Sequence, residues 1–205
     1  MNTSKEKYNR LAGFYDLHSK FAEKLWFIKW RKKFFAPLKG NILDVGIGTG
    51  KNIEFYDKEA KVIGIDFSEK MLEKAKEKLI KTDTKNITLK HMDAENLHFK
   101  DNSFDYVVTS CVFCSVPNPI KGLKEIRRVL KPTGRLIMIE HVLSKNPVIA
   151  LIEHVINPLT RLIMGANINR NTKQNIIKSG MKIVEDRNLA LFDVFRLFIA
   201  KKSSK

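Results

Sequence analysis

Short apolar runs alternate with amphipathic stretches along most of this chain, and this alternation predicts strands separated by helices. Buried strands are expected at Asn41–Val45, Lys61–Ile65, Ile87–Leu89, Phe104–Ser110 and Arg135–Glu140. The helices between them would turn their apolar residues to the sheet, in one case Met71, Leu72, Ala75 and Leu79, in another Leu123, Ile126, Val129 and Leu130. Strands and helices that alternate at this spacing are typical of a mostly parallel sheet.

The two ends of the chain follow other patterns. Three- and four-residue spacing of apolar positions predicts helices before Pro37, including an aromatic and lysine-rich stretch at Lys20–Phe35. After the fifth strand we expect an apolar helix at Val148–Met164, interrupted at Pro158, and a further helix near Asn171–Ser179. The last two strands, Met181–Leu189 and Val194–Ala200, are close enough in sequence to pair as an antiparallel hairpin.

These elements predict a doubly wound, Rossmann-like α/β fold with a mostly parallel seven-stranded sheet. We expect a single domain over residues 1–205, with an N-terminal helical cap at 1–39 and a helical lid insertion at 145–170.

A glycine-rich loop, Asp44-Val-Gly46-Ile-Gly48-Thr-Gly50, lies between a predicted strand and a predicted helix. Glycines there would let a ligand approach bare backbone, although the loop could also be only a tight turn. The spacing G-x-G-x-G differs from the G-x-G-x-x-G of dinucleotide folds, and no Gly-Lys-Ser/Thr of a phosphate loop is present. An acid beside the loop would repel pyrophosphate but suit a cationic ligand such as a sulfonium amino acid.

Here the sequence resembles the class I S-adenosylmethionine-dependent methyltransferases, over almost the whole chain from about residue 8. The resemblance implies S-adenosylmethionine as cofactor and no metal. It assigns the methionine half to Asp44, Gly46, Gly48 and Gly50, and the ribose hydroxyls to Asp66. Phe67 and Met71 would flank the adenine, and the motif with Asp93 and Ala94 would receive its amino group. Ser110, which ends the fourth motif, would also bind the cofactor. Each of these residues, taken alone, could have a purely structural role such as a tight turn or a helix cap, and Asp105 is left out of the site for that reason. The order of five motifs along the chain is what favours the family.

The catalytic candidates are His141, at the end of the fifth strand, and Tyr15 near the amino terminus, with His18 as a further option. A base is needed only if the acceptor arrives protonated, and a lone histidine can equally be a packed residue. Cys111 and Cys114 are interpreted as small buried hydrophobes, since no other cysteine or clustered histidine would complete a metal site.

The net charge of +16 predicts an anionic partner, and its excess of lysine and arginine lies mainly in the first 39 and last 65 residues. Basic residues interleaved with aromatics over Tyr8–Phe35 suit an anionic membrane surface, the alternative being a helix whose aromatics are buried in the core. Nucleic acid is disfavoured because no RNA-binding module is recognisable. With two cysteines and no signal peptide, we expect a cytoplasmic protein, peripheral on the inner face of the membrane.

The methyl acceptor is left open among several chemistries. The stretch after the fourth strand, Ser110–Pro117, is mostly apolar. It lacks the Asn/Asp-Pro-Pro-Tyr/Phe motif of methyltransferases that act on the exocyclic amines of bases or on glutamine amides. Residues 125–132 resemble quinone C-methyltransferases, whereas Cys111–Pro117, Glu140–Val142 and Gly165–Arg170 resemble lipid, thiol and phosphatidylethanolamine methyltransferases. Methylation of a phospholipid headgroup amine is the leading hypothesis. Its rivals are C-methylation of a quinone precursor, S-methylation of a thiol, and a cofactor-binding protein without turnover.

Overall fold

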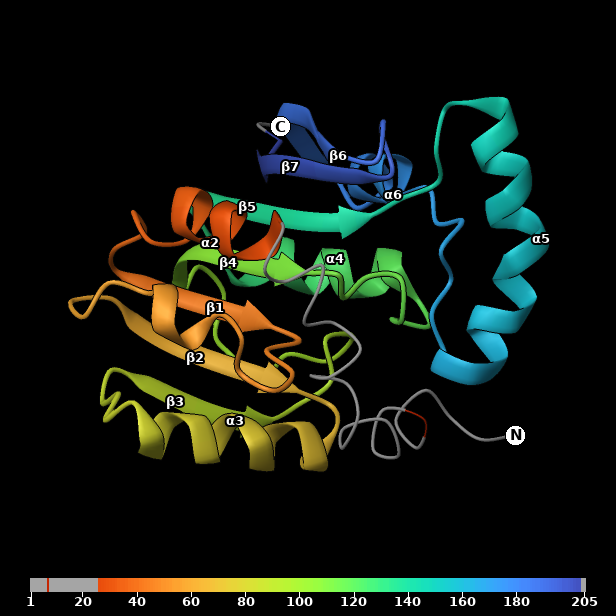
Figure 1. The fold of residues 1–205 in the computed structure, drawn as a ribbon. Helices are drawn as coiled ribbons and strands as arrows, with labels where there is room; N and C mark the ends of the chain where they lie inside the picture. Colours follow the sequence, from red (N-terminus) through yellow and green to blue (C-terminus); the bar gives the residue numbers. More distant parts are fainter. Residues whose placement is uncertain (1–6, 8–25, 204–205) are drawn as a thin grey trace.

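The computed structural model describes Lys7 and residues 26–203, and it consists of one twisted sheet with helices on both of its faces (Figure 1). The strands are β1 (Asn41–Val45), β2 (Lys61–Asp66), β3 (Ile87–His91), β4 (Phe104–Ser110), β5 (Leu130–His141), β6 (Met181–Ala190) and β7 (Phe195–Lys202). The helices are α2 (Ile28–Phe34), the 3-10 helix η2 (Ile53–Phe55), α3 (Glu69–Lys81), α4 (Pro119–Val129), α5 (Pro147–Met164) and α6 (Thr172–Lys178).

The seven strands lie in the order β3-β2-β1-β4-β5-β7-β6. The first five are mutually parallel, while β7 runs antiparallel to both β5 and β6. The predicted fold class is therefore confirmed, including the antiparallel C-terminal hairpin. All five parallel strands direct their carboxyl ends to the same edge of the sheet, which is where ligands bind in doubly wound folds.

Two apolar cores cover the two faces of the sheet, because successive strand residues point to opposite sides. In β5, Leu136 and Met138 pack with α4 and α6, whereas Ile137 and Ile139 face the core that contains α2 and α3. The central strands β1 and β4 are mostly buried on both faces, which explains why their sequences are largely apolar, whereas the edge strands β3 and β6 are more exposed.

Three local predictions differ from the structure. The glycine loop is followed by only the short η2, since the ten residues between Gly50 and Lys61 leave no room for a long helix. The expected interruption at Pro158 is wrong, because α5 continues through this proline from Pro147 to Met164. The turn predicted at residues 131–134 is a bulge within β5, where the register with β4 shifts between Phe104 and Tyr106.

The described part of the aromatic stretch packs inward. Trp30 and Phe35 are buried, and Phe27 lies edge-on to Phe195 of β7 with ring centroids 5.6 Å apart. For residues 26–35 the interpretation as a cover over the sheet is thus the one that the structure supports, with Lys29, Lys32 and Lys33 exposed. Residues 8–25, which hold the rest of the predicted cap, lie outside the described residues.

Candidate functional site

A cavity of about 440 Å³ opens at the carboxyl ends of the parallel strands. It is lined by residues from the ends of β1, β2, β3 and β4 and from the loops that follow them. Eight of the residues predicted for the cofactor meet there: Gly46, Gly48, Asp66, Phe67, Met71, Asp93, Ala94 and Ser110. Residues separated by more than sixty positions in the sequence are therefore brought to one site.

The glycine loop presents backbone to this cavity at Gly48. Its φ of +56° lies in the left-handed region, and a Cβ built there would meet no heavy atom closer than the Gly46 carbonyl oxygen at 4.0 Å. Gly50 also has a positive φ, but a Cβ there would approach Ile53 Cδ1 to 2.5 Å and Ala75 Cα to 3.2 Å. Gly48 therefore leaves space for a ligand, whereas Gly50 lets the loop pack against α3.

Asp66, the last residue of β2, joins the loop to the start of α3. Its Oδ2 accepts a hydrogen bond from Gly48 N at 3.0 Å, and its Oδ1 accepts one from Ser68 N at 2.8 Å. Burial raises the pKa of the Asp66 carboxyl, while the backbone donors act in the opposite direction. Phe67 N is a third backbone donor to this carboxylate. Since a carboxylate has about four acceptor sites, a ribose hydroxyl would compete with these backbone donors for the remaining capacity.

Asp44 lies beneath the glycine loop and is absent from the cavity lining. Its Oδ2 accepts hydrogen bonds from Asn52 Nδ2 at 2.9 Å and Tyr56 OH at 2.8 Å, and Arg31 Nε donates to Asn52 Oδ1 at 2.6 Å. Burial raises the pKa of Asp44 to about 6. In the structure this predicted cofactor residue connects the loop to η2 and α2.

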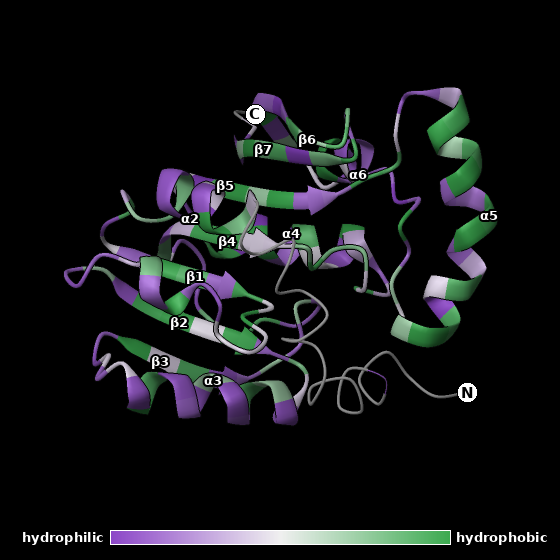
Figure 2. Ribbon diagram, in the orientation of Figure 1, coloured by the Kyte–Doolittle hydropathy of each residue, from purple (hydrophilic) through white to green (hydrophobic). Residues whose placement is uncertain are grey.

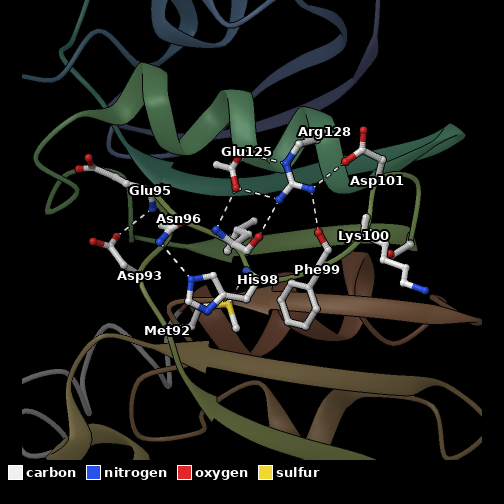
Figure 3. Close-up of polar contacts among 12 residues, drawn as sticks. Met92, Asp93, Glu95, Asn96, His98, Phe99, Lys100, Asp101, Glu125 and Arg128 are labelled. Carbon is white, nitrogen blue, oxygen red and sulfur yellow. Dashed lines mark hydrogen bonds and ion pairs between the residues drawn. The ribbon is translucent and has the colours of Figure 1, made fainter.

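Asp93 and Ala94 begin a loop that a polar network fastens to α4 (Figure 3). Arg128 is the centre of this network and donates to Leu97 O at 2.6 Å, to Phe99 O at 2.7 Å and to the carboxylates of Glu125 and Asp101. A further hydrogen bond holds the loop against α4, because Leu97 N donates to Glu125 Oε2 at 2.9 Å. The network positions the Asp93–Ala94 edge of the cavity without touching the cavity itself.

The loop after β4 forms the apolar wall of the cavity. Its lining residues are Cys111, Val112, Ser115, Val116 and Pro117. Cys111 has a φ of +55°, which turns the chain sharply at the end of the strand, and burial raises the pKa of its thiol well above the ordinary value. The thiol therefore stays protonated and acts as an apolar wall group, as the sequence indicated.

Glu140, to which the sequence gave no role of its own, holds this wall in place. Its carboxylate is buried and accepts hydrogen bonds from Thr109 Oγ1 at 2.6 Å, from Val112 N and from Phe113 N at 3.2 Å. Burial raises the pKa of Glu140 to about 7. An acid at the carboxyl end of an otherwise apolar strand was the signal that could have found it.

Only one of the two catalytic candidates, His141, lies among the described residues. His141 does not line the cavity among the described residues; its Nδ1 lies 3.0 Å from Ile168 O, and its Nε2 lies 3.8 Å from Glu153 Oε1. Since a carbonyl oxygen only accepts, Nδ1 carries the proton, and burial lowers the pKa of the ring. Tyr15 lies outside the described residues, so both catalytic assignments stay predictions.

The cavity has the chemistry that a cationic nucleoside ligand requires. Asp66 and Asp93 contribute carboxylates, Gly48 leaves room against bare backbone, and Phe67 and Met71 contribute apolar surface for a base. These residues fit S-adenosylmethionine, whose sulfonium is positively charged. No group of three metal-ligating side chains occurs within residues 26–203 or at Lys7.

Comparison with known proteins identifies the family of the chain. The family described as "Methyltransferase domain" matches residues 43–138. A demethylmenaquinone methyltransferase of Listeria monocytogenes serotype 4a is 37% identical over 166 residues, which cover 77% of this chain and 68% of the relative. A phosphatidylethanolamine N-methyltransferase of Cereibacter sphaeroides is 35% identical over 115 residues, covering 56% and 57% of the two chains.

Solved structures share the fold. A chain of the Haloferax volcanii complex between the Trm112 methyltransferase activator and a putative methyltransferase has a TM-score of 0.75 at 18% identity, with 96% of this chain and 98% of that chain covered. An S-adenosylmethionine-dependent methyltransferase from Aquifex aeolicus has a TM-score of 0.65 at 22% identity, covering 94% and 96%. The protein belongs to the class I S-adenosylmethionine-dependent methyltransferases and is an enzyme of that class.

Proposed function

We propose that this methyltransferase acts on an acceptor carried by a lipid, with a ring carbon of a quinone precursor as the first candidate. The observation that carries the proposal is the apolar wall at Cys111, Val112, Val116 and Pro117. This wall belongs to the same cavity as the acidic residues that fit the cofactor. Such a wall suits a flat or lipophilic acceptor and excludes water from the transfer.

The order of candidates differs from the one that the sequence alone favoured. Demethylmenaquinone methyltransferases match a longer part of the chain than the phosphatidylethanolamine enzyme does. In addition, the described residues of the wall include no carboxylate and no aromatic ring that would hold an ammonium group. The phospholipid headgroup amine stays the second candidate, supported by the Cereibacter sphaeroides relative.

The cofactor, when bound, supplies a methyl group that its sulfonium already activates, so alignment contributes most of the rate. In the proposed mechanism Asp66 holds the cofactor end of the cavity through the glycine loop, and Glu140 fixes the wall against which the acceptor lies. A buried and protonated Cys111 thiol makes no nucleophile, so the acceptor would take the methyl directly. On a ring carbon the C–CH3 bond would form as the S–CH3 bond breaks, with S-adenosylhomocysteine as leaving group, and the hydrogen on that carbon would then leave as a proton to water.

The test is incubation of the protein with methyl-labelled S-adenosylmethionine and a total membrane extract, followed by partition between organic and aqueous phases. Label in the organic phase supports a lipid-borne acceptor, and chromatography beside authentic menaquinone and methylated phosphatidylethanolamine separates the two candidates. Label confined to the aqueous phase would overturn the proposal in favour of a small thiol or amine.

A further inference from the structure

Three polar side chains of helix α5 face the protein. Glu153 is buried and its Oε2 accepts a hydrogen bond from Ser144 N at 2.8 Å. One turn on, Asn157 Oδ1 accepts from Ile168 N at 2.9 Å. On the following turn, the Thr160 hydroxyl shares its proton between Ala166 O at 3.1 Å and Asn157 O at 3.0 Å. The spacing of these three residues defines one stripe of the helix, and this stripe fastens α5 to the loops around it.

Most of the other residues of α5 are apolar and exposed, and Figure 2 shows hydrophobic bands along the helix with hydrophilic bands between them. Two polar residues, His154 and Arg161, are exposed as well. Exposed fractions reach 71% at both Val155 and Leu162. The full set of exposed apolar residues on this helix is Val148, Leu151, Ile152, Val155, Ile156, Leu159, Leu162, Ile163 and Met164. A helix on the surface of a protein in water normally has the opposite arrangement, and a continuous apolar patch of this kind marks an interaction site.

A second exposed apolar group lies beside the amino end of α5. Phe192, on the turn between β6 and β7, is 82% exposed and has a φ of +60°, which is a costly conformation for an aromatic residue. The next residue, Asp193, accepts hydrogen bonds from Ser144 Oγ and from Lys145 N, so the turn is held against the start of the helix. The apolar surface thus has contributions from two separate elements.

We propose that the exposed face of α5, together with Phe192, inserts into the surface of an anionic lipid bilayer, with the helix axis in the plane of the membrane. The charge distribution favours this occupant. Lys145 precedes the helix, Arg161 is exposed on it, and the Lys7 amine lies 2.8 Å from Arg161 O. With a net charge of +16, a second copy of the chain would be repelled, whereas anionic headgroups would be attracted.

By length and composition alone, the 18 residues of α5 could cross a membrane. The contacts of Glu153, Asn157 and Thr160 argue for the in-plane arrangement, because a spanning helix would have to leave its partners and carry Glu153 into hydrocarbon. An in-plane helix keeps these bonds on the protein side and buries only the apolar face.

The position of α5 also links the membrane to the cavity. Figure 1 shows α5 at the edge of the sheet toward which β5 and the other parallel strands point. The segment after α5 contacts the wall directly, since Asn167 N donates to Cys114 O at 2.8 Å and Arg170 Nη2 donates to Val116 O at 3.0 Å. A bilayer beneath α5 would therefore lie close to the site that, on the proposed function, receives a lipid.

The experiment is sedimentation of the full chain with vesicles of equal amounts of phosphatidylglycerol and phosphatidylcholine, without cofactor or acceptor. The double variant Val155→Ser/Leu162→Ser removes two exposed apolar groups, and Ile80→Ser/Val184→Ser removes two that lie on α3 and β6. We expect the α5 variant to bind at least about tenfold more weakly and the control variant to bind like the parent protein. A Leu162→Trp variant should be quenched more by lipids brominated near the headgroup than by lipids brominated near the chain end.

Three results would overturn the proposal. Equal vesicle binding by the α5 variant and the parent would exclude this face. If the parent protein binds no vesicles but forms a dimer, and the α5 variant is a monomer, the face would belong to a contact with a second copy of the chain. If the parent protein binds no vesicles, and the α5 variant but not the control variant has a lower melting temperature than the parent, a segment of the chain itself would cover the helix. Because methyl transfer is not measured, none of these results depends on the proposed acceptor.

Discussion

At the scale of single residues, Asp66 is the group on which cofactor binding should depend most. We predict that Asp66→Asn weakens binding of S-adenosylhomocysteine about 10- to 100-fold, because an unpaired polar group in the complex costs about 1–3 kcal/mol. Isothermal titration calorimetry measures this, with the exposed Asp83→Asn as control, since Asn tolerates the φ of +46° at that position. Unchanged affinity in Asp66→Asn would contradict the assignment of the cavity.

Two glycines of the same loop should respond to alanine in different ways. In Gly48→Ala the added methyl group extends into open space at the cavity, so we expect a loss of about 1–2 kcal/mol from the positive φ and a marked loss of cofactor affinity. In Gly50→Ala the methyl group also meets Ile53 and Ala75, which adds about 1–3 kcal/mol of overpacking. Urea unfolding of both variants checks this order; equal destabilisation would show that Gly48 has no free space beside it.

Each motif residue could be predicted from the sequence, but which of them line the cavity and which support the loop from behind could not. Gly48 and Asp66 were predicted for the cofactor and line the cavity, whereas Asp44 and Gly50 of the same motif lie away from it. This difference depends on which way a loop turns and on what packs behind it, and sequence spacing contains neither. Glu140 was missed for a related reason, since its partners Val112 and Phe113 donate backbone groups that no side-chain pattern reveals.

At the scale of elements, the loop after β3 depends on α4 through Arg128. We predict that Arg128→Ala lowers the free energy of unfolding by about 2 kcal/mol, because the Leu97 and Phe99 carbonyls lose their donor and two carboxylates lose their partner. Cofactor affinity should fall as well, since Asp93 and Ala94 begin that loop. Lys124→Ala, an exposed position on the same helix, is the matched control for both measurements.

Element positions followed from the sequence where periodicity was strong. Six of the seven strands were predicted to within about two residues at each end, because runs such as Asn41–Val45 are mostly apolar and end at turn residues. The exception is β5, which begins at Leu130 where a turn was expected. Helix α5 was predicted too, as part of a helical lid insertion, and its role as a lid stays a prediction. Its apolar residues gave no sign that Glu153, Asn157 and Thr160 would form the inward stripe, since this depends on the partners that neighbouring loops offer.

At the scale of the whole molecule, two buried carboxyls should make stability depend on pH. Burial raises the pKa of Asp44 to about 6 and that of Glu140 to about 7, above their unfolded values. The folded state then binds more protons than the unfolded state between about pH 4 and 7, so stability falls as pH rises through this window. We expect a loss of about 1–3 kcal/mol for Glu140 alone.

Urea unfolding at pH 5 and pH 7 measures the effect, and Glu140→Gln provides the comparison because its side chain does not titrate. The variant should lose less stability than the parent between the two pH values. An identical pH dependence in both proteins would show that Glu140 ionises in the folded state at its ordinary pKa.

The outward apolar face of α5 has a consequence for kinetics. A protein held at a bilayer by this face meets its acceptor by diffusion in two dimensions, so the relevant concentration is the number of acceptor molecules per unit of membrane area. Adding inert lipid to a fixed amount of acceptor would then slow turnover through surface dilution, although the bulk concentration of acceptor stays the same. The orientation of one helix would thereby decide in which units the substrate dependence of the enzyme is expressed.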